Sequence, residues 1–184
     1  MQKWQIKNYN KLMKKLLILT FAVFAFAACA KESSKQQPSP APAAQETAAV
    51  YTLPAVNGGE AFVLKKTGAD KPVLVASMAG FCGFCKRMIP YIDELAGKYK
   101  GKNVDVIIAF VDQKSDELKN LEPVKTVKNV KVYYNGSQFA QDNGVSGFPT
   151  MLFINNKTGE TQKWVGFDPG YVDVMSAEID KALK

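Results

Sequence analysis

The sequence predicts an α/β protein in which helices flank a central mixed β-sheet. Two runs, residues 73–78 and 104–111, contain one polar residue each, which is typical of strands buried on both faces of a sheet. Segments with apolar residues at helical spacing alternate with these runs. A hairpin and an amphipathic helix then end the chain. This order favours a sheet with helices on both of its faces.

The other elements follow in chain order, each from a local pattern. Apolar residues spaced three and four apart predict a helix over residues 82–99. Gly144 is suited to end a short helix before it. Two runs around a turn at residues 155–159 predict the hairpin. Further strands are expected at residues 130–134, 150–154 and 161–165, and further helices at residues 115–121, 137–143 and 171–183.

The composition excludes several classes of site. The 184 residues include three Cys and no His, and they carry a formal net charge of +7. Without His there can be no Ser-His or Cys-His catalytic pair and no His-ligated metal site. The apolar content of 47% is that of a globular protein, and the length allows one domain with short extensions.

The N-terminus has the pattern of a secretory signal. Residues 1–15 contain five Lys and no acidic residue, and residues 16–28 form an apolar run of thirteen. A transmembrane helix needs about 20 such residues. A weak membrane anchor or a buried helix is the alternative, and Met13 is a second candidate start. Without these five Lys the net charge is about +2, so charge gives no argument for nucleic-acid binding.

The end of this run, Phe26-Ala27-Ala28-Cys29, resembles a bacterial lipobox. Two small residues precede Cys29, although Phe26 stands where Leu is usual. The resemblance implies that residues 1–28 are a lipoprotein signal peptide and that Cys29 is lipidated. Ordinary cleavage nearby, which would leave Cys29 as a free thiol, is the alternative.

A flexible tether is predicted over residues 29–49. Residues 30–49 are rich in Pro, Ser, Gln and Ala and contain no aliphatic side chain larger than Ala. Such a segment cannot bury a core. The folded domain is therefore expected over residues 50–184.

Redox chemistry is predicted at Cys82 and Cys85, which are separated by Gly83 and Phe84. The motif follows a buried strand and opens a helix, where unpaired N–H groups and the helix dipole stabilise a thiolate. We expect Cys82 to be the exposed attacking sulfur and Cys85 to resolve the mixed disulfide. A zinc site would need two further Cys or His ligands in the domain, which has none. A structural disulfide is an alternative, although closing so short a loop stabilises little.

Two separate signatures resemble the thioredoxin superfamily. The stretch from Pro72 through the two Cys to Pro90 is similar to its central strand, active-site turn and kinked helix, and residues 145–150 are similar to its second signature, which ends in a cis-proline. The resemblance implies a thioredoxin-like fold and a cis bond before Pro149, which would keep metal ions off the sulfurs. It implies no cofactor beyond the redox-active cysteine pair. The substrate-binding residues that it implies are Phe81, Gly83, Phe84, Phe148 and Pro149.

The segment from Asp112 to Pro149 is longer than in plain thioredoxins. Its extra strand and helix, residues 130–144, resemble the insertion of the TlpA- and ResA-like branch, whose members are membrane-tethered extracytoplasmic oxidoreductases. Ala76 and Met88 stand where relatives carry a buried Asp and a Glu that can accept a proton. Candidate replacements in this chain are Asp112, Asp116, Glu117 and Glu122.

The resemblance implies reduction of exported proteins, with a membrane protein as the electron donor. A tethered binding or chaperone-like module with a permanent disulfide stays open, as does an isomerase or oxidant. The expected partners are exported proteins with thiols or disulfides and the membrane itself, through a lipid on Cys29. The aromatic side chains expected to pack in or at the edge of the core are Tyr133, Tyr134, Phe139, Trp164 and Phe167.

Overall fold

A computed structural model describes residues 49–66, 68 and 71–184. The signal peptide, Cys29 and almost all of the tether, which were expected within residues 1–49, lie outside the described residues. Within the described part of the chain, no helix combines the length and the apolar character needed to span a bilayer.

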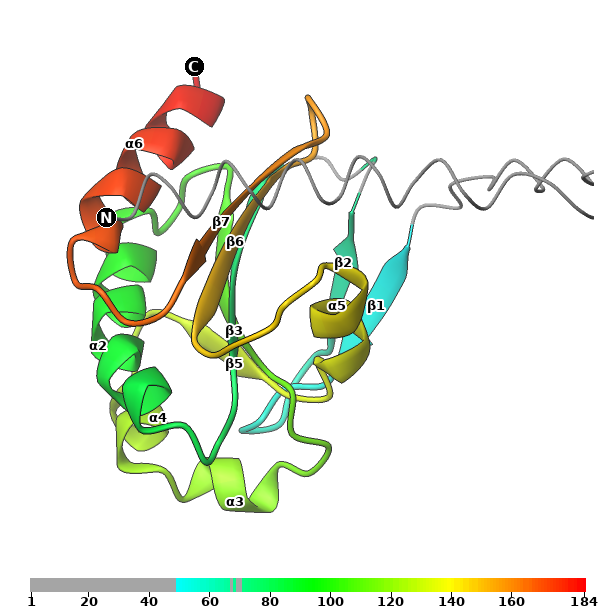
Figure 1. Cartoon of the computed structure of the whole chain (residues 1–184), viewed down its shortest axis with the longest axis vertical. Coiled ribbons are helices and arrows are strands. Elements are labelled where there is room, and N and C mark those ends of the chain that lie inside the picture. Colours follow the sequence, from blue (N-terminus) through cyan, green and yellow to red (C-terminus); the bar gives the residue numbers. More distant parts are fainter. Residues whose placement is uncertain (1–48, 67, 69–70) are drawn as a thin grey trace, which may run out of the picture. The chain divides into compact units, whose positions relative to one another are not determined.

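A five-stranded mixed sheet forms the centre of the domain, in the order β5-β4-β3-β6-β7 (Figure 1). The three strands on one side are parallel, and the last two run antiparallel to their neighbours. The predicted mixed sheet is therefore confirmed. Central strand β3 is buried along its whole length, as its apolar run predicts. The strands are β3 (Val73–Met78), β4 (Asp105–Phe110), β5 (Lys131–Tyr133), β6 (Thr150–Asn155) and β7 (Glu160–Val165).

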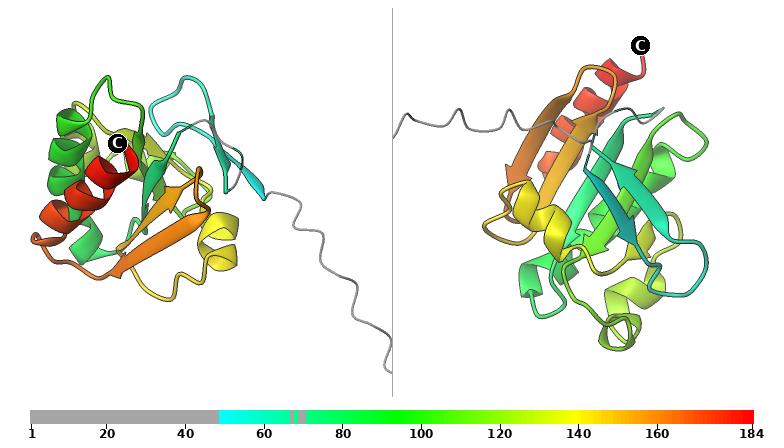
Figure 2. Two further views of the ribbon diagram at one scale, coloured as in Figure 1. Left: turned by 90° about the horizontal axis from the view of Figure 1, so that it is seen from above. Right: turned by 90° about the vertical axis from the view of Figure 1, so that its right-hand side faces the viewer.

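Helices lie on both faces of this sheet, as predicted (Figures 1 and 2). On one face, Ile92 of α2 and Ile179 of α6 belong to the larger buried cluster. On the other face, Phe139 of α5 packs in a second cluster with Val75 of β3. The helices are α2 (Gly83–Lys98), α3 (Asp116–Lys119), α4 (Glu122–Thr126), α5 (Ser137–Asp142) and α6 (Tyr171–Ala182).

An N-terminal hairpin, which the sequence pattern did not predict, covers the second face beside α5. It consists of β1 (Val50–Leu53) and β2 (Phe62–Lys65), which pair antiparallel as a separate two-stranded sheet. The ring of Tyr51 meets that of Phe139 edge-on, with centroids 5.3 Å apart. Each strand has only four residues, too few for a clear alternating pattern.

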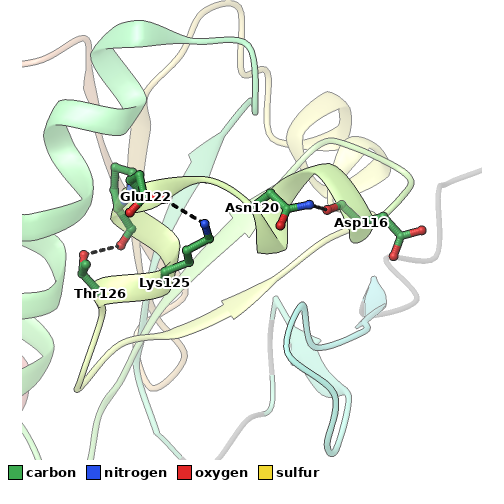
Figure 3. A network of polar contacts seen from close by, with 6 residues as sticks. Asp116, Asn120, Glu122, Lys125 and Thr126 are labelled. Atoms are coloured by element: carbon green, nitrogen blue, oxygen red, sulfur yellow. Dashed lines mark hydrogen bonds and ion pairs between the residues drawn. The ribbon is translucent and has the colours of Figure 1, made fainter.

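Helices α3 and α4 form the connection between β4 and β5, and α4 was also not predicted (Figure 3). Local contacts hold both turns: the Lys125 ammonium lies 2.8 Å from the Glu122 carboxylate, and the Asn120 amide donates to the Asp116 carbonyl at 3.0 Å. The carboxylates of Asp116, Glu117 and Glu122 are exposed. None of these three is placed to replace a buried proton acceptor.

Candidate active site

The turn after β3 places the cysteine motif at the carboxyl end of the central strand. The N–H of Cys82 donates to the Ala79 carbonyl at 3.0 Å, which tightens the turn. Cys82 is the N-cap of α2, and its Sγ accepts the N–H of Cys85 at 3.1 Å. The Cys82 sulfur thus caps one of the backbone N–H groups that lack a partner within the helix. The predicted placement of the motif at a helix N-terminus is confirmed.

The two cysteines differ in exposure, as expected. Cys82 is partly exposed, whereas the side chain of Cys85 is completely buried. Burial and, to a smaller extent, a hydrogen bond with Cys82 raise the pKa of the Cys85 thiol to about 12. Cys85 therefore holds its proton at neutral pH.

The loop before β6 borders Cys82 from the opposite side. The Phe148–Pro149 peptide bond is cis, as the resemblance implied. The Cys82 thiol donates to the Phe148 carbonyl at 3.5 Å. In the same loop, the Gly147 carbonyl accepts a hydrogen bond from the Thr150 hydroxyl at 2.7 Å, which fixes the loop to the start of β6. Cys82 and Phe148 are 66 residues apart in the chain, so the fold brings the two signatures together at the Cys82 sulfur.

Asp112, two residues after the end of β4, supports the turn that leads to Cys82. One carboxylate oxygen accepts the N–H of Gly80 at 2.9 Å. A Cβ on Gly80 would lie 2.9 Å from the other oxygen, so any larger residue here would have to displace this carboxylate. Of the four candidate carboxylates, Asp112 alone among the described residues is bonded to the active-site turn. The positions with the missing acids, Ala76 and Met88, are fully buried.

Comparison with known proteins adds a decisive observation. A family model described as Redoxin matches residues 36–183, which is most of the chain. The chain belongs to the Redoxin family. Its fold and its two signatures place it in the thioredoxin superfamily.

Relatives of this Redoxin protein come from several lineages. It is 33% identical over 90 residues to thioredoxin from Rickettsia felis, covering 49% of this chain and 84% of that protein. It is 30% identical over 97 residues to protein disulfide-isomerase from Drosophila melanogaster, covering 50% of this chain and 19% of that protein. The chain thus spans about a fifth of the length of this isomerase.

A solved structure with similar architecture is that of thiol:disulfide interchange protein DsbE from Chlorobium tepidum. The TM-score is 0.59 at 27% identity, over 74% of this chain and 95% of that one. This likeness and the named relatives support thiol–disulfide exchange at the Cys82–Cys85 pair.

The other expected substrate-binding residues surround the Redoxin dithiol. Phe81 is 83% exposed and Phe84 is 55% exposed, while Phe148 is partly buried. A Cβ on Gly83 would meet no atom within 4 Å, so this position is open toward solvent. These placements are compatible with a surface for an extended peptide, whose use in binding stays a prediction.

Sequence reasoning missed the stacking of Arg87 on two aromatic rings beside the motif. Arg87 and Phe167 both contact Phe84, and Phe167 also packs at the edge of the larger core cluster, as expected. Helical spacing from Phe84 to Arg87 was a usable signal, whereas the approach of Phe167 depends on the tertiary fold. Among residues 49–66, 68 and 71–184, no group of three or more His, Cys, Asp or Glu is placed to hold a metal ion.

Proposed function

We propose that this protein is an extracytoplasmic thiol–disulfide oxidoreductase that reduces disulfides of exported proteins with Cys82 and Cys85. The asymmetry of the two sulfurs carries the proposal. Cys82 is accessible and receives an amide hydrogen bond, while Cys85 is fully buried behind it. Only one sulfur of the pair can meet a protein substrate, as a two-step exchange requires.

In the first step the Cys82 thiolate attacks one sulfur of a substrate disulfide. The substrate S–S bond breaks, a mixed disulfide forms, and the departing substrate sulfur takes up a proton. Cys85 then loses its proton and attacks the Cys82 sulfur. The mixed disulfide breaks, and the second substrate thiol leaves after protonation. The substrate gains two electrons and two protons, and the cysteine pair ends as a disulfide.

Burial of Cys85 sets the order of these steps. Because its pKa is raised to about 12, Cys85 stays a thiol until the mixed disulfide has formed. The Phe148 carbonyl beside Cys82 offers a backbone acceptor to an extended substrate segment. Turnover as a reductant then needs an electron donor, for which we propose a membrane protein.

The proposed location rests on the N-terminal sequence. Five Lys, an apolar run and the segment before Cys29 favour export and lipidation at Cys29. A tether of about 20 residues reaches at most about 70 Å when fully extended, so the domain can act at a distance from the membrane.

Insulin reduction tests the activity. We expect the wild-type chain to accelerate the reduction of insulin by dithiothreitol, and Cys82→Ser to lose that acceleration. Equal rates for the two proteins would contradict the enzymatic proposal and favour a binding module. Trapping then tests the substrates: Cys85→Ser should accumulate mixed disulfides on Cys82 with exported proteins, identifiable by mass spectrometry.

Disulfide isomerisation is the second candidate, favoured by the match to a protein disulfide-isomerase. The reduction potential separates the two. A value near or below about −270 mV fits a reductant, and a value near about −180 mV fits an isomerase.

A further inference from the structure

A cationic group lies on two aromatic rings beside the dithiol. Phe84 belongs to the cysteine motif, Arg87 follows one turn later on α2, and Phe167 comes from the loop after β7. The guanidinium carbon of Arg87 lies 4.6 Å from the centre of the Phe84 ring and 4.7 Å from that of Phe167. The two ring centres are 6.3 Å apart. These distances place the guanidinium on top of the ring pair, not between the rings.

Arg87 stays exposed to solvent while its guanidinium lies on the two rings. Both rings attract the flat cation through their π faces. The ring of Tyr91 lies 6.1 Å from that of Phe167 and supports it from the next turn of α2. In the described part of the chain, none of the ion pairs includes Arg87. Its positive charge is therefore available to an incoming group.

The position of the group relative to Cys82 gives it access to a bound substrate. The N–H of Gly166, next to Phe167, donates to the carbonyl of Pro149 at 2.8 Å. Phe167 is thus fixed to the same loop whose Phe148 carbonyl contacts Cys82. The guanidinium also lies on the ring of Phe84, which is part of the motif and is 55% exposed. A substrate that covers the motif at Cys82 and Phe84 therefore comes close to Arg87.

We propose that Arg87 is a specificity-determining residue that binds the carboxylate of an Asp or Glu close to the reacting cysteine of a protein substrate. A guanidinium can bond a carboxylate through two parallel N–H groups, which a Lys ammonium cannot. The Phe84 and Phe167 rings hold that fork in place before the substrate arrives. The preferred substrates are disulfides with acidic neighbours. This specificity rests on the proposed exchange function.

Two matched peptide disulfides test the specificity. Each short capped peptide carries one cysteine joined to 2-mercaptoethanol, a neutral thiol, with either Glu or Gln on both sides of the cysteine. The reduced full chain is mixed with each peptide, and the second-order rate constant is measured by chromatography. The rate of each peptide with dithiothreitol corrects for its own reactivity. We expect the wild type to prefer the Glu peptide by about fivefold, and 0.5 M salt to weaken that preference.

Variants assign the preference to a side chain. Arg87→Gln should lower the ratio of the two rates to about one and leave the rate for the Gln peptide within about twofold of wild type. Lys86→Gln, which removes a neighbouring cation, should leave the ratio unchanged. An unchanged ratio in Arg87→Gln would overturn the proposal. An equal loss with both peptides would also overturn it, because Arg87 would then only position Phe84.

The same measurement separates this specificity from the exchange function. Reaction of the wild type with both peptides at equal corrected rates would overturn the specificity alone. No reaction with either peptide would overturn the exchange function and the specificity together.

Discussion

At Cys85, burial controls both reactivity and a part of the stability. The side chain is completely enclosed by the larger core cluster, and burial is the main reason that its pKa is raised to about 12. The ordinary value is 9.0, so the folded protein favours the neutral thiol. The free energy of unfolding therefore depends on pH through Cys85. The stabilisation from its neutral thiol is fully present below about pH 9 and is lost as the pH rises toward about 12.

Alkylation of the reduced protein at pH 8 should therefore distinguish the cysteines. Iodoacetamide reacts with accessible thiolates, so we expect peptide mapping to find Cys82 modified and Cys85 unmodified in the native protein. In guanidinium chloride, both should be modified. Modification of Cys85 at the rate of Cys82 in the native protein would contradict its burial.

The pH dependence offers a second measurement on the same residue. Between pH 9 and pH 11, Cys85→Ala should lose less free energy of unfolding than the reduced wild type. Tyr51 titrates in the same range, since burial raises its pKa to about 12 as well, but it is present in both proteins. Parallel curves for the two proteins would show that Cys85 does not contribute to this slope.

At the scale of the elements, one carboxylate joins the active-site helix to the edge of the sheet. Asp93 of α2 accepts the N–H groups of Lys128, Asn129 and Val130, at distances between 2.7 and 3.2 Å. Burial by itself would raise the pKa of this carboxyl, but hydrogen bonds from the three amides outweigh it and lower the pKa from 3.8. The charged form therefore stabilises the fold at neutral pH.

Asp93→Asn should destabilise the protein by about 1–2 kcal/mol at pH 7, because neutral amide acceptors bind N–H groups less strongly than a carboxylate does. Urea unfolding measures the difference. The folded-state pKa is the lower one, so the stabilisation is present above about pH 4 and is lost as the pH falls through the folded value. The gap between wild type and variant should therefore narrow at pH 3.

The exposed neighbour Glu94 gives the matched control, since it lies on the same helix without these amide contacts. Glu94→Gln should change the stability by less than about 0.5 kcal/mol. If the difference in unfolding free energy between wild type and Asp93→Asn were the same at pH 7 and at pH 3, the ionised Asp93 carboxylate would not be the source of the stabilisation.

At the scale of the whole domain, the hairpin completes the second face of the sheet. Leu53 and Leu64 are buried in the cluster that also holds Phe139. The segment after β1 also pairs with the edge strand β5: the N–H of Val56 donates to the Val132 carbonyl at 2.9 Å, and that of Tyr134 donates to the Pro54 carbonyl at 3.0 Å. An open sheet edge is thereby covered.

Leu53→Ala should accordingly destabilise the entire domain by about 2–5 kcal/mol, because it leaves a cavity against the sheet. Unfolding in urea followed by Trp fluorescence and by far-UV circular dichroism should give one coincident transition. Val63→Ala is the control from the paired strand, where the side chain is 53% exposed, and it should cost less than about 1 kcal/mol. A loss below about 1 kcal/mol for Leu53→Ala would show that the hairpin contributes little to the stability of the domain.

Local sequence patterns were sufficient to predict the long helices and strands and the position of the cysteine pair at a helix start. The apolar run of β3 and the helical spacing in α2 predicted both elements almost to the residue, because burial on both faces and on one helical stripe leaves a strong periodic signal. Short elements gave weaker signals. The four-residue strands β1 and β2 are held by Phe139, whose sequence position lies far away.

The sequence by itself predicted the α/β class and the placement of Cys82 and Cys85 at a helix start, since each depends on residues close together in the chain. The cis bond at Pro149 was implied by the resemblance of the second signature to the thioredoxin superfamily. Only the tertiary structure decided which acidic side chain supports the turn before Cys82 and which groups border the dithiol. Asp112 reaches Gly80 from 32 residues away, and Phe167 reaches Arg87 from the loop after the edge strand β7. Such contacts follow from the order of strands β4, β3 and β6, which periodicity within one segment does not encode.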